Sequence, residues 1–258
     1  MTREHPPLPW LEPGQAFPAP AQAWGLDSPA PGLLAAGGAL DTETLKRAYG
    51  QGIFPWFSEG QPPLWWSTDP RMVLRADAFV LHHSLRKKLQ ALLRAHRLDI
   101  RIDSAFASVI GHCANAPREG QAGTWIVPPM VQAYCALYAA GFAHSVETWI
   151  DGSLVAGLYC VALGRAVFGE SMFTQVSDGS KIALAALVAL CRAEGATQID
   201  CQQVTPHLAS LGASPVRREL FLRDMQAQAG LPAMHWRFDP VYWKQLGLTP
   251  PDGGQNTA

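Results

Sequence analysis

The segment that most constrains the fold is an apolar stretch from Ser180 to Glu194, which lies between two strand-like runs. Its apolar residues cover almost the whole circumference of a helix, and Gly195 follows as a stop. A helix of this kind must be buried on most sides. Strand-like runs at 165–168 and 197–202 flank it, so the sequence predicts a strand–helix–strand crossover packed on a mixed sheet.

Local patterns predict further elements around this crossover. The expected elements are a helix over 42–50 capped by Asp41, helices over 84–97 and 128–141, and strands over 143–147 and 154–163 joined by a turn at Asp151-Gly152. The first thirty or so residues are rich in proline, which sustains neither a helix nor a central strand. They are expected to form an extended, irregular segment.

Composition narrows the class of protein. The chain has 258 residues, of which 48% are hydrophobic, and a formal net charge of -1. A core of good size is therefore possible, and a generally basic protein that coats nucleic acid is excluded. The five cysteines form no CxxC pair, which favours reduced thiols and a cytoplasmic protein. Neither a secretory leader nor a membrane span is expected.

Polar residues interrupt segments that otherwise have the pattern of buried strands. Glu170 follows one such run, and Asp200 and Gln202 end another. Side chains alternate along a strand, so Asp200 and Gln202 are expected to share one face, with Cα atoms about 7 Å apart. A carboxylate handles a proton and a carboxamide both donates and accepts, which suits attack of an amine on an acyl group. A polar face on an edge strand is the alternative.

The predicted helix over 84–97 carries a basic stripe. Arg86, Lys87, Arg94 and Arg97 fall in one sector beside a leucine stripe, and no acidic residue occurs between Ser84 and Leu98. Such a stripe is either a solvated surface or a site of phosphate contact, and both interpretations stay open.

Several kinds of site are excluded by their missing residues. The run around Ser171 lacks the second glycine of a nucleophile elbow, and no P-loop, dinucleotide fingerprint, HExxH motif or Cys/His zinc spacing occurs. Cys201 is expected to be a core thiol, because it faces away from Asp200 and burial raises a thiol pKa.

A set of motifs, taken together, resembles the leucyl/phenylalanyl-tRNA–protein transferase family over roughly residues 30–225. The motifs are Gly32–Gly38, Tyr49–Phe57, Trp65-Trp66-Ser67, Ser84–Lys87, Thr124-Trp125-Ile126, Ala143–Glu147, Gly169–Phe173, Ser180-Lys181, Asp200-Cys201-Gln202 and His207–Ala213.

The resemblance implies an α+β fold. A small N-terminal α/β domain, residues 1–76 with the Pro-rich opening segment, would pack on an acetyltransferase-like (GNAT-type) mixed-sheet domain, residues 77–247. Residues 248–258 are expected to be a disordered tail, because they are rich in proline and glycine.

The implied activity is transfer of Leu or Phe, with Met as a further candidate, from aminoacyl-tRNA to the α-amino group of proteins that begin with Lys or Arg. This peptide bond would create a bacterial N-degron and lead to degradation. The resemblance implies neither a cofactor nor a metal, and no membrane partner; a monomer is expected.

The resemblance also implies site residues, which are assigned through the matching motifs. Asp200, Gln202 and Glu170 would handle the incoming amine. Leu158, Phe168, Leu184 and Ile199 are the candidates for the aminoacyl pocket, with Ser171, Met172 and Phe173 from the adjoining motif. Trp56 and Trp125 could form an aromatic wall for the terminal adenosine or the aminoacyl group. Arg86, Lys87 and Lys88, together with Arg94 and Arg97, are the candidates for tRNA phosphates.

The chain departs from the family pattern at a few positions, namely Ala39, His83 and Thr174-Gln175. These departures remove charge from surfaces expected to face RNA or substrate. Two alternative functions are an acyl-CoA-dependent N-acetyltransferase, which lacks the expected pyrophosphate-binding loop, and a non-catalytic RNA-binding module that uses only the basic helix.

Overall fold

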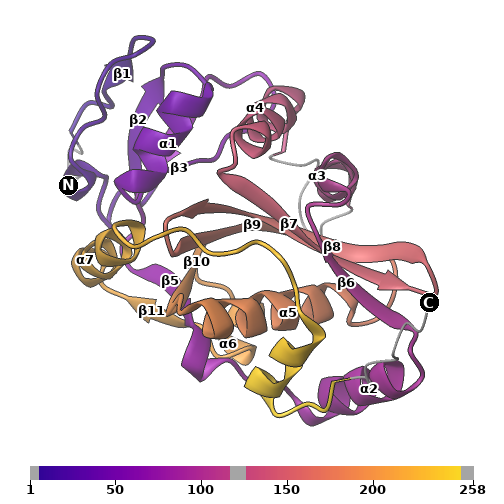
Figure 1. The fold of residues 1–258 in the computed structure, drawn as a ribbon. Coiled ribbons are helices and arrows are strands. Elements are labelled where there is room, and N and C mark those ends of the chain that lie inside the picture. The colour runs from indigo at the N-terminus through magenta and orange to yellow at the C-terminus, as the bar shows by residue number, and fades with distance from the viewer. Residues whose placement is uncertain (1–5, 117–125, 251–258) are drawn as a thin grey trace.

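Two β-sheets and the helices around them make up the protein, which a computed structural model describes for residues 6–116 and 126–250 (Figure 1). The smaller sheet has the strand order β1-β2-β4-β3 and comes from the first part of the chain. Its strands are β1 Trp10–Leu11, β2 Leu33–Gly37, β3 Phe54–Pro55 and β4 Leu64–Trp66.

The larger sheet is mixed and has the order β11-β5-β10-β9-β8-β7-β6. Its strands are β5 Arg71–Arg75, β6 Leu98–Ile102, β7 Ala143–Ile150, β8 Ser153–Leu163, β9 Ala166–Thr174, β10 Gln198–Gln202 and β11 Ser214–Val216. Strands β9 and β10 run parallel, and the other neighbours pair antiparallel. The predicted crossover is thus confirmed, and so is the α+β architecture with a mixed sheet.

Helices cover both faces of the larger sheet. The helices of the described residues are α1 Thr42–Gly50, α2 His83–Arg94, α3 Phe106–Asn115, α4 Pro128–Ala139, α5 Gly179–Glu194, α6 Pro206–Ser210 and α7 Arg218–Ala229, with 3-10 turns at Pro20–Gln22, Ala76–Ala78 and Pro240–Leu246. Helix α5 lies against one face with α2, and α3 and α4 lie on the other (Figure 1).

The core is divided into two clusters by the larger sheet. One cluster lies on the α5 face, where the helix is buried almost all round, as its composition predicts. The other extends from the α3–α4 face into the N-terminal segment and includes both Tyr49 of α1 and Phe168 of β9. The small sheet and the large sheet therefore share one continuous core.

Helix α1 follows its predicted bounds, because the amide of Thr44 donates to Asp41 Oδ1 at 2.7 Å and so satisfies a free donor of the first turn. Helix α2 is shorter than predicted. It ends at Arg94, and His96 takes a left-handed φ of 52° that no continuing helix allows. Arg97 therefore lies outside the helix.

The ends of the predicted domains stay predictions. Strand β5, just before the expected boundary at Asp77, belongs to the larger sheet. Leu248, the first residue of the expected tail, is buried at 3% exposure, and residues 251–258 lie outside the described ranges.

Candidate functional site

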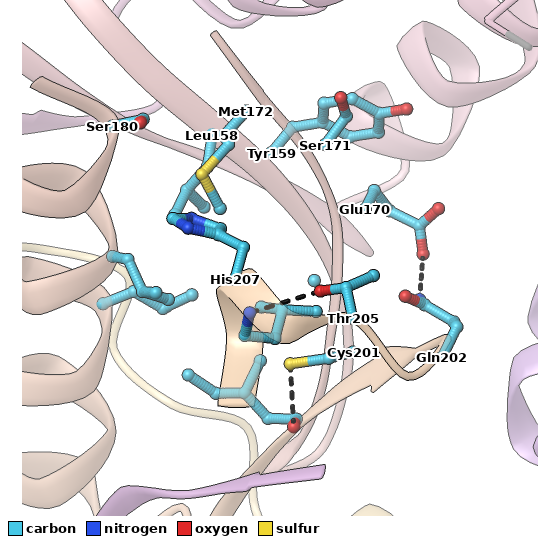
Figure 2. A pocket seen from close by; sticks show the side chains of 15 residues that line it. Leu158, Tyr159, Glu170, Ser171, Met172, Ser180, Cys201, Gln202, Thr205 and His207 are labelled. Atoms are coloured by element: carbon cyan, nitrogen blue, oxygen red, sulfur yellow. Dashed lines mark hydrogen bonds between the residues drawn. The ribbon is translucent and has the colours of Figure 1, made fainter. Parts of the chain in front are cut away.

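The candidate site lies where strands β9 and β10 part. The two strands are paired at Ile199 with Val167 and at Asp200 with Phe168. Beyond that point Gln202 reaches across and its Nε2 donates to Glu170 Oε1 at 3.2 Å. Figure 2 shows these two side chains facing one another at the edge of a cavity.

The cavity has a volume of about 480 Å³ and is lined by residues of β8, β9, β10, α5 and α6 (Figure 2). Five predicted pocket residues line it together with Glu170 and Gln202: Leu158, Ser171, Met172, Leu184 and Ile199. Its other lining residues were not among the predicted pocket residues: Tyr159, Gly169, Ser180, Leu187, Cys201, Thr205, His207 and Leu208. One wall is thus apolar and the opposite edge carries the carboxyl and the carboxamide.

Three predicted substrate residues lie away from this cavity. Phe168 is fully buried on the other face, with its ring 5.0 Å from that of Tyr49. Phe173 is buried there as well, against His112, and Trp56 packs against Trp66 in the small sheet. Alternation along β9 explains the position of Phe168, because Val167 takes the face of α5. The remaining candidate, Trp125, lies outside the described residues.

Glu170 is held by two tyrosines from different helices. Tyr49 of α1 donates to its Oε1 at 2.8 Å, and Tyr134 of α4 donates to its Oε2 at 3.0 Å. The two hydroxyl oxygens are themselves 2.5 Å apart. Burial raises the pKa of Glu170 to about 8, although the two tyrosine hydrogen bonds oppose the rise.

Asp200 has a different environment, since it forms a buried ion pair with Arg71. Nε of Arg71 donates to Oδ1 at 2.8 Å and Nη2 donates to Oδ2 at 2.6 Å, and both side chains are at most 2% exposed. The rings of Phe54 and Phe221 lie 4.7 and 4.6 Å from the guanidinium carbon. This arrangement compensates both charges inside the core.

Gln202 owes its direction to a bulge. The register of β10 shifts between Asp200 and Gln202, and Gln202 has a left-handed φ of 54°. Its backbone amide donates to Asp200 Oδ1 at 2.9 Å, which stabilises this conformation. The regular alternation assumed from the sequence is therefore wrong at this position.

Cys201 lines the cavity but is poorly suited to act as a nucleophile. Burial raises the pKa of its thiol to about 12, so the thiolate is scarce at neutral pH.

Family comparisons agree on one family. A model of the leucyl/phenylalanyl-tRNA protein transferase matches residues 73–226, and a model of that family's N-terminal domain matches residues 38–69. A leucyl/phenylalanyl-tRNA–protein transferase from Albidiferax ferrireducens is 60% identical over 250 residues, which cover 97% of this chain and 98% of the relative. The chain belongs to the leucyl/phenylalanyl-tRNA–protein transferase family. It is an aminoacyltransferase, as the resemblance predicted.

Other members of this transferase family match over similar lengths. One from Polaromonas sp. is 60% identical over 93% of this chain and 94% of its own. Among solved structures, a GCN5-related N-acetyltransferase from Kribbella flavida has 12% identity and a TM-score of 0.32, over 65% of this chain and 58% of that one. The fold class rests on the sheet topology and not on this similarity.

The basic residues of this transferase lie on and after α2, and most already have partners. Arg86 donates to the carbonyl of Gly247 at 2.9 Å, and Lys88 contacts the carbonyl of Ser177 and lies 3.8 Å from Asp178. Arg97 pairs with Asp151 at 2.6 Å.

The acidic partners Asp178 and Asp151 come from other parts of the chain. The positive charge of the basic stripe is therefore compensated more than the sequence of 84–97 alone indicates. Lys87 and Arg94 are exposed.

Within residues 6–116 and 126–250, no cluster of three or more His, Cys, Asp or Glu side chains could hold a metal ion. In the same ranges, no helix combines the length and apolar character needed to cross a membrane.

Sequence reasoning missed Tyr49, Tyr134 and Arg71. Tyr49 is part of a family motif, but its pattern in α1 indicates only a buried helical face, and nothing in Tyr134 or Arg71 signals a partner more than thirty residues away. Their roles follow from tertiary contact alone.

Proposed function

We propose that this chain transfers Leu or Phe, with Met as a further candidate, from aminoacyl-tRNA to the α-amino group of proteins that begin with Lys or Arg. The new peptide bond would mark the acceptor as a bacterial N-degron, in the cytoplasm, and the enzyme would act as a monomer. The observation that carries this proposal is the junction of an apolar cavity with the Glu170–Gln202 pair where β9 and β10 part.

The apolar wall suits the side chain of the transferred amino acid. Leu158, Leu184 and Ile199 present hydrocarbon to the cavity, and Met172 adds a flexible side chain. A hydrophobic pocket distinguishes side chains by size only modestly. Acceptance of both Leu and Phe fits such a wall.

The polar edge suits the acceptor amine. The aminoacyl ester is already activated, so the enzyme needs to position two substrates and remove one proton. Gln202 uses Nε2 to hold Glu170, which leaves its Oε1 to accept from an amine. Asp200 supports this arrangement through the backbone of Gln202.

The tRNA would contact the basic residues around α2. Arg86, Lys87, Lys88, Arg94 and Arg97 would face acceptor-arm phosphates, which need positive charge but no base reading. Trp56 and Trp125 stay candidates for stacking on the 3′ adenosine.

A transfer assay tests the proposal. Radiolabelled Leu-tRNA and Phe-tRNA are each mixed with the enzyme and a peptide that begins with Lys or Arg. Label is expected in these peptides, and none in a matched peptide that begins with Asp or after RNase treatment of the tRNA. Absence of label from the Lys and Arg peptides would contradict the proposed function.

A further inference from the structure

The contacts among Glu170, Tyr49 and Tyr134 show how many hydrogen atoms this cluster needs. Three oxygen pairs lie within hydrogen-bond distance, namely Tyr49 with Glu170, Tyr134 with Glu170, and the two hydroxyls with one another at 2.5 Å. Each contact needs one hydrogen, and the two phenols supply only two. With an ionised carboxylate both phenols donate to Glu170 and the contact between the two hydroxyls has no hydrogen of its own. A proton gained by Glu170 supplies the third hydrogen, because the neutral acid can then donate to one phenol.

Both oxygens of the other carboxylate of the site, Asp200, already accept hydrogen bonds. Oδ1 of Asp200 accepts from Arg71 Nε and from the amide of Gln202, and Oδ2 accepts from Arg71 Nη2. Moving a proton to Asp200 would leave the buried Arg71 cation without its partner, which is costly. Asp200 is also absent from the cavity lining, whereas Glu170 and Gln202 belong to it.

We propose that Glu170, held by Tyr49 and Tyr134, takes the proton that the acceptor ammonium gives up, while Asp200 keeps Gln202 in position. This inference rests on the proposed function, and it identifies Tyr49 and Tyr134 as positioning residues for the reaction.

The step balances in atoms and charge. The ammonium gives one proton to the Glu170 carboxylate and becomes a neutral amine. Its lone pair forms the bond to the ester carbonyl carbon, the bond from that carbon to the ribose oxygen breaks, and the ribose oxygen takes a second proton from the nitrogen. One hydrogen stays on the new amide, and Glu170 passes its proton to solvent after the product leaves.

The surroundings of Glu170 are consistent with this exchange. The groups that face it are Tyr49 from α1, Tyr134 from α4, Asp200 from β10 and Arg71 from β5. Burial outweighs the phenols and raises the pKa of Glu170 to about 8. An α-amino group ordinarily titrates at about 7.7–8.0, so the proton passes between groups of similar affinity.

The test compares kcat/KM against pH for transfer to an Arg-starting peptide. The enzymes are the wild type, Tyr49→Phe, Tyr134→Phe and Glu170→Gln, with Tyr138→Phe as the matched control. Tyr138 lies on the same helix as Tyr134, but its hydroxyl donates to the carbonyl of Asp103. The free peptide titrates identically throughout, so differences between enzymes belong to the protein.

The two phenol variants are expected to shift the acidic limb to higher pH, because each removes a hydrogen bond to the ionised carboxylate. Tyr138→Phe should leave the limb in place, and Glu170→Gln should lower kcat/KM about 100-fold or more. A purely structural role of the phenols would lower the rate without moving the limb. The inference is overturned if the wild type transfers the amino acid and both phenol variants keep the acidic limb at the wild-type pH.

A second measurement does not depend on transfer. In ¹³C NMR of protein labelled at the glutamate carboxyls, one signal should titrate near pH 8 and be lost in Glu170→Gln. If the wild type transfers nothing, the proposed function fails and this titration still reports on Glu170. A Glu170 signal that titrates near the ordinary value of about 4.3 overturns the inference.

Discussion

Two carboxyl groups from neighbouring strands have opposite roles because their surroundings differ. Asp200 has a guanidinium partner that compensates its charge within the core. Glu170 has two phenols and an amide, which offer hydrogen bonds but no full positive charge at contact distance. Burial therefore favours the neutral form of Glu170, whereas ion pairing keeps Asp200 in place.

At this scale, Arg71→Ala is expected to lower the free energy of unfolding by about 3–5 kcal/mol, because it leaves the Asp200 carboxylate buried without a cationic partner. Urea denaturation followed by fluorescence measures the loss. The matched control is Arg97→Ala, which breaks an ion pair of the same type whose side chains are 54% and 55% exposed and should change stability little. Equal losses in the two variants would contradict the structural role of the buried pair.

Helix α2 combines a packed face and a charged face. Leu85, Leu89 and Leu93 join the core beneath α5, and the basic residues lie along the rest of the helix. Contacts with Gly247 and Ser177 tie two of those basic residues to other elements. The helix is therefore oriented by both its leucines and its charges.

At the scale of this element, an Arg86/Lys87/Lys88→Ala variant is expected to weaken tRNA binding and to flatten its dependence on salt. The slope of log K against log salt should fall by about 1 for each phosphate contact removed. Filter binding at several salt concentrations measures it. The charge-matched control replaces three arginines away from α2 that each pair with an aspartate nearby in the chain, Arg75, Arg101 and Arg223. An unchanged slope in the α2 variant would indicate that the tRNA docks on another face of the protein.

The whole molecule assembles the site from distant parts of the chain. Tyr49 comes from the N-terminal segment, Tyr134 from α4, Glu170 from β9 and Gln202 from β10. The core shared between the small sheet and one face of the large sheet holds the two tyrosines in register with Glu170. The site therefore depends on the packing of both parts of the protein.

The pH dependence of the stability of the whole molecule should reveal the raised pKa of the Glu170 carboxyl. The folded pKa of Glu170, about 8, lies above its ordinary value of about 4.3, so between these values the folded protein holds a proton that the unfolded chain has released. Stability should then fall as pH rises through this window and level off above it. Urea denaturation from pH 5 to 9 is expected to show this fall in the free energy of unfolding of the wild type. In Glu170→Gln, the part of the fall that comes from Glu170 should be absent. A difference in the free energy of unfolding between the wild type and Glu170→Gln that stays constant with pH would contradict this prediction.

Local pattern determined much of the fold and part of the site. The all-round apolar run predicts the burial of α5, Asp41 predicts the start of α1, and the polar interruptions point to Glu170, Asp200 and Gln202. The apolar candidates Leu158, Leu184 and Ile199 line the cavity, and their role as the aminoacyl pocket stays a prediction. These features follow from propensity, capping and alternation, which act over a few neighbouring residues.

Only the tertiary structure decided the partners. It brings Arg71 to Asp200, places Tyr49 and Tyr134 on Glu170, and directs Gln202 through a bulge that alternation does not foresee. It also turns Phe168 away from the cavity. Such contacts join residues far apart in the chain, and their energy depends on burial and charge compensation that exist only once the sheets and helices have packed.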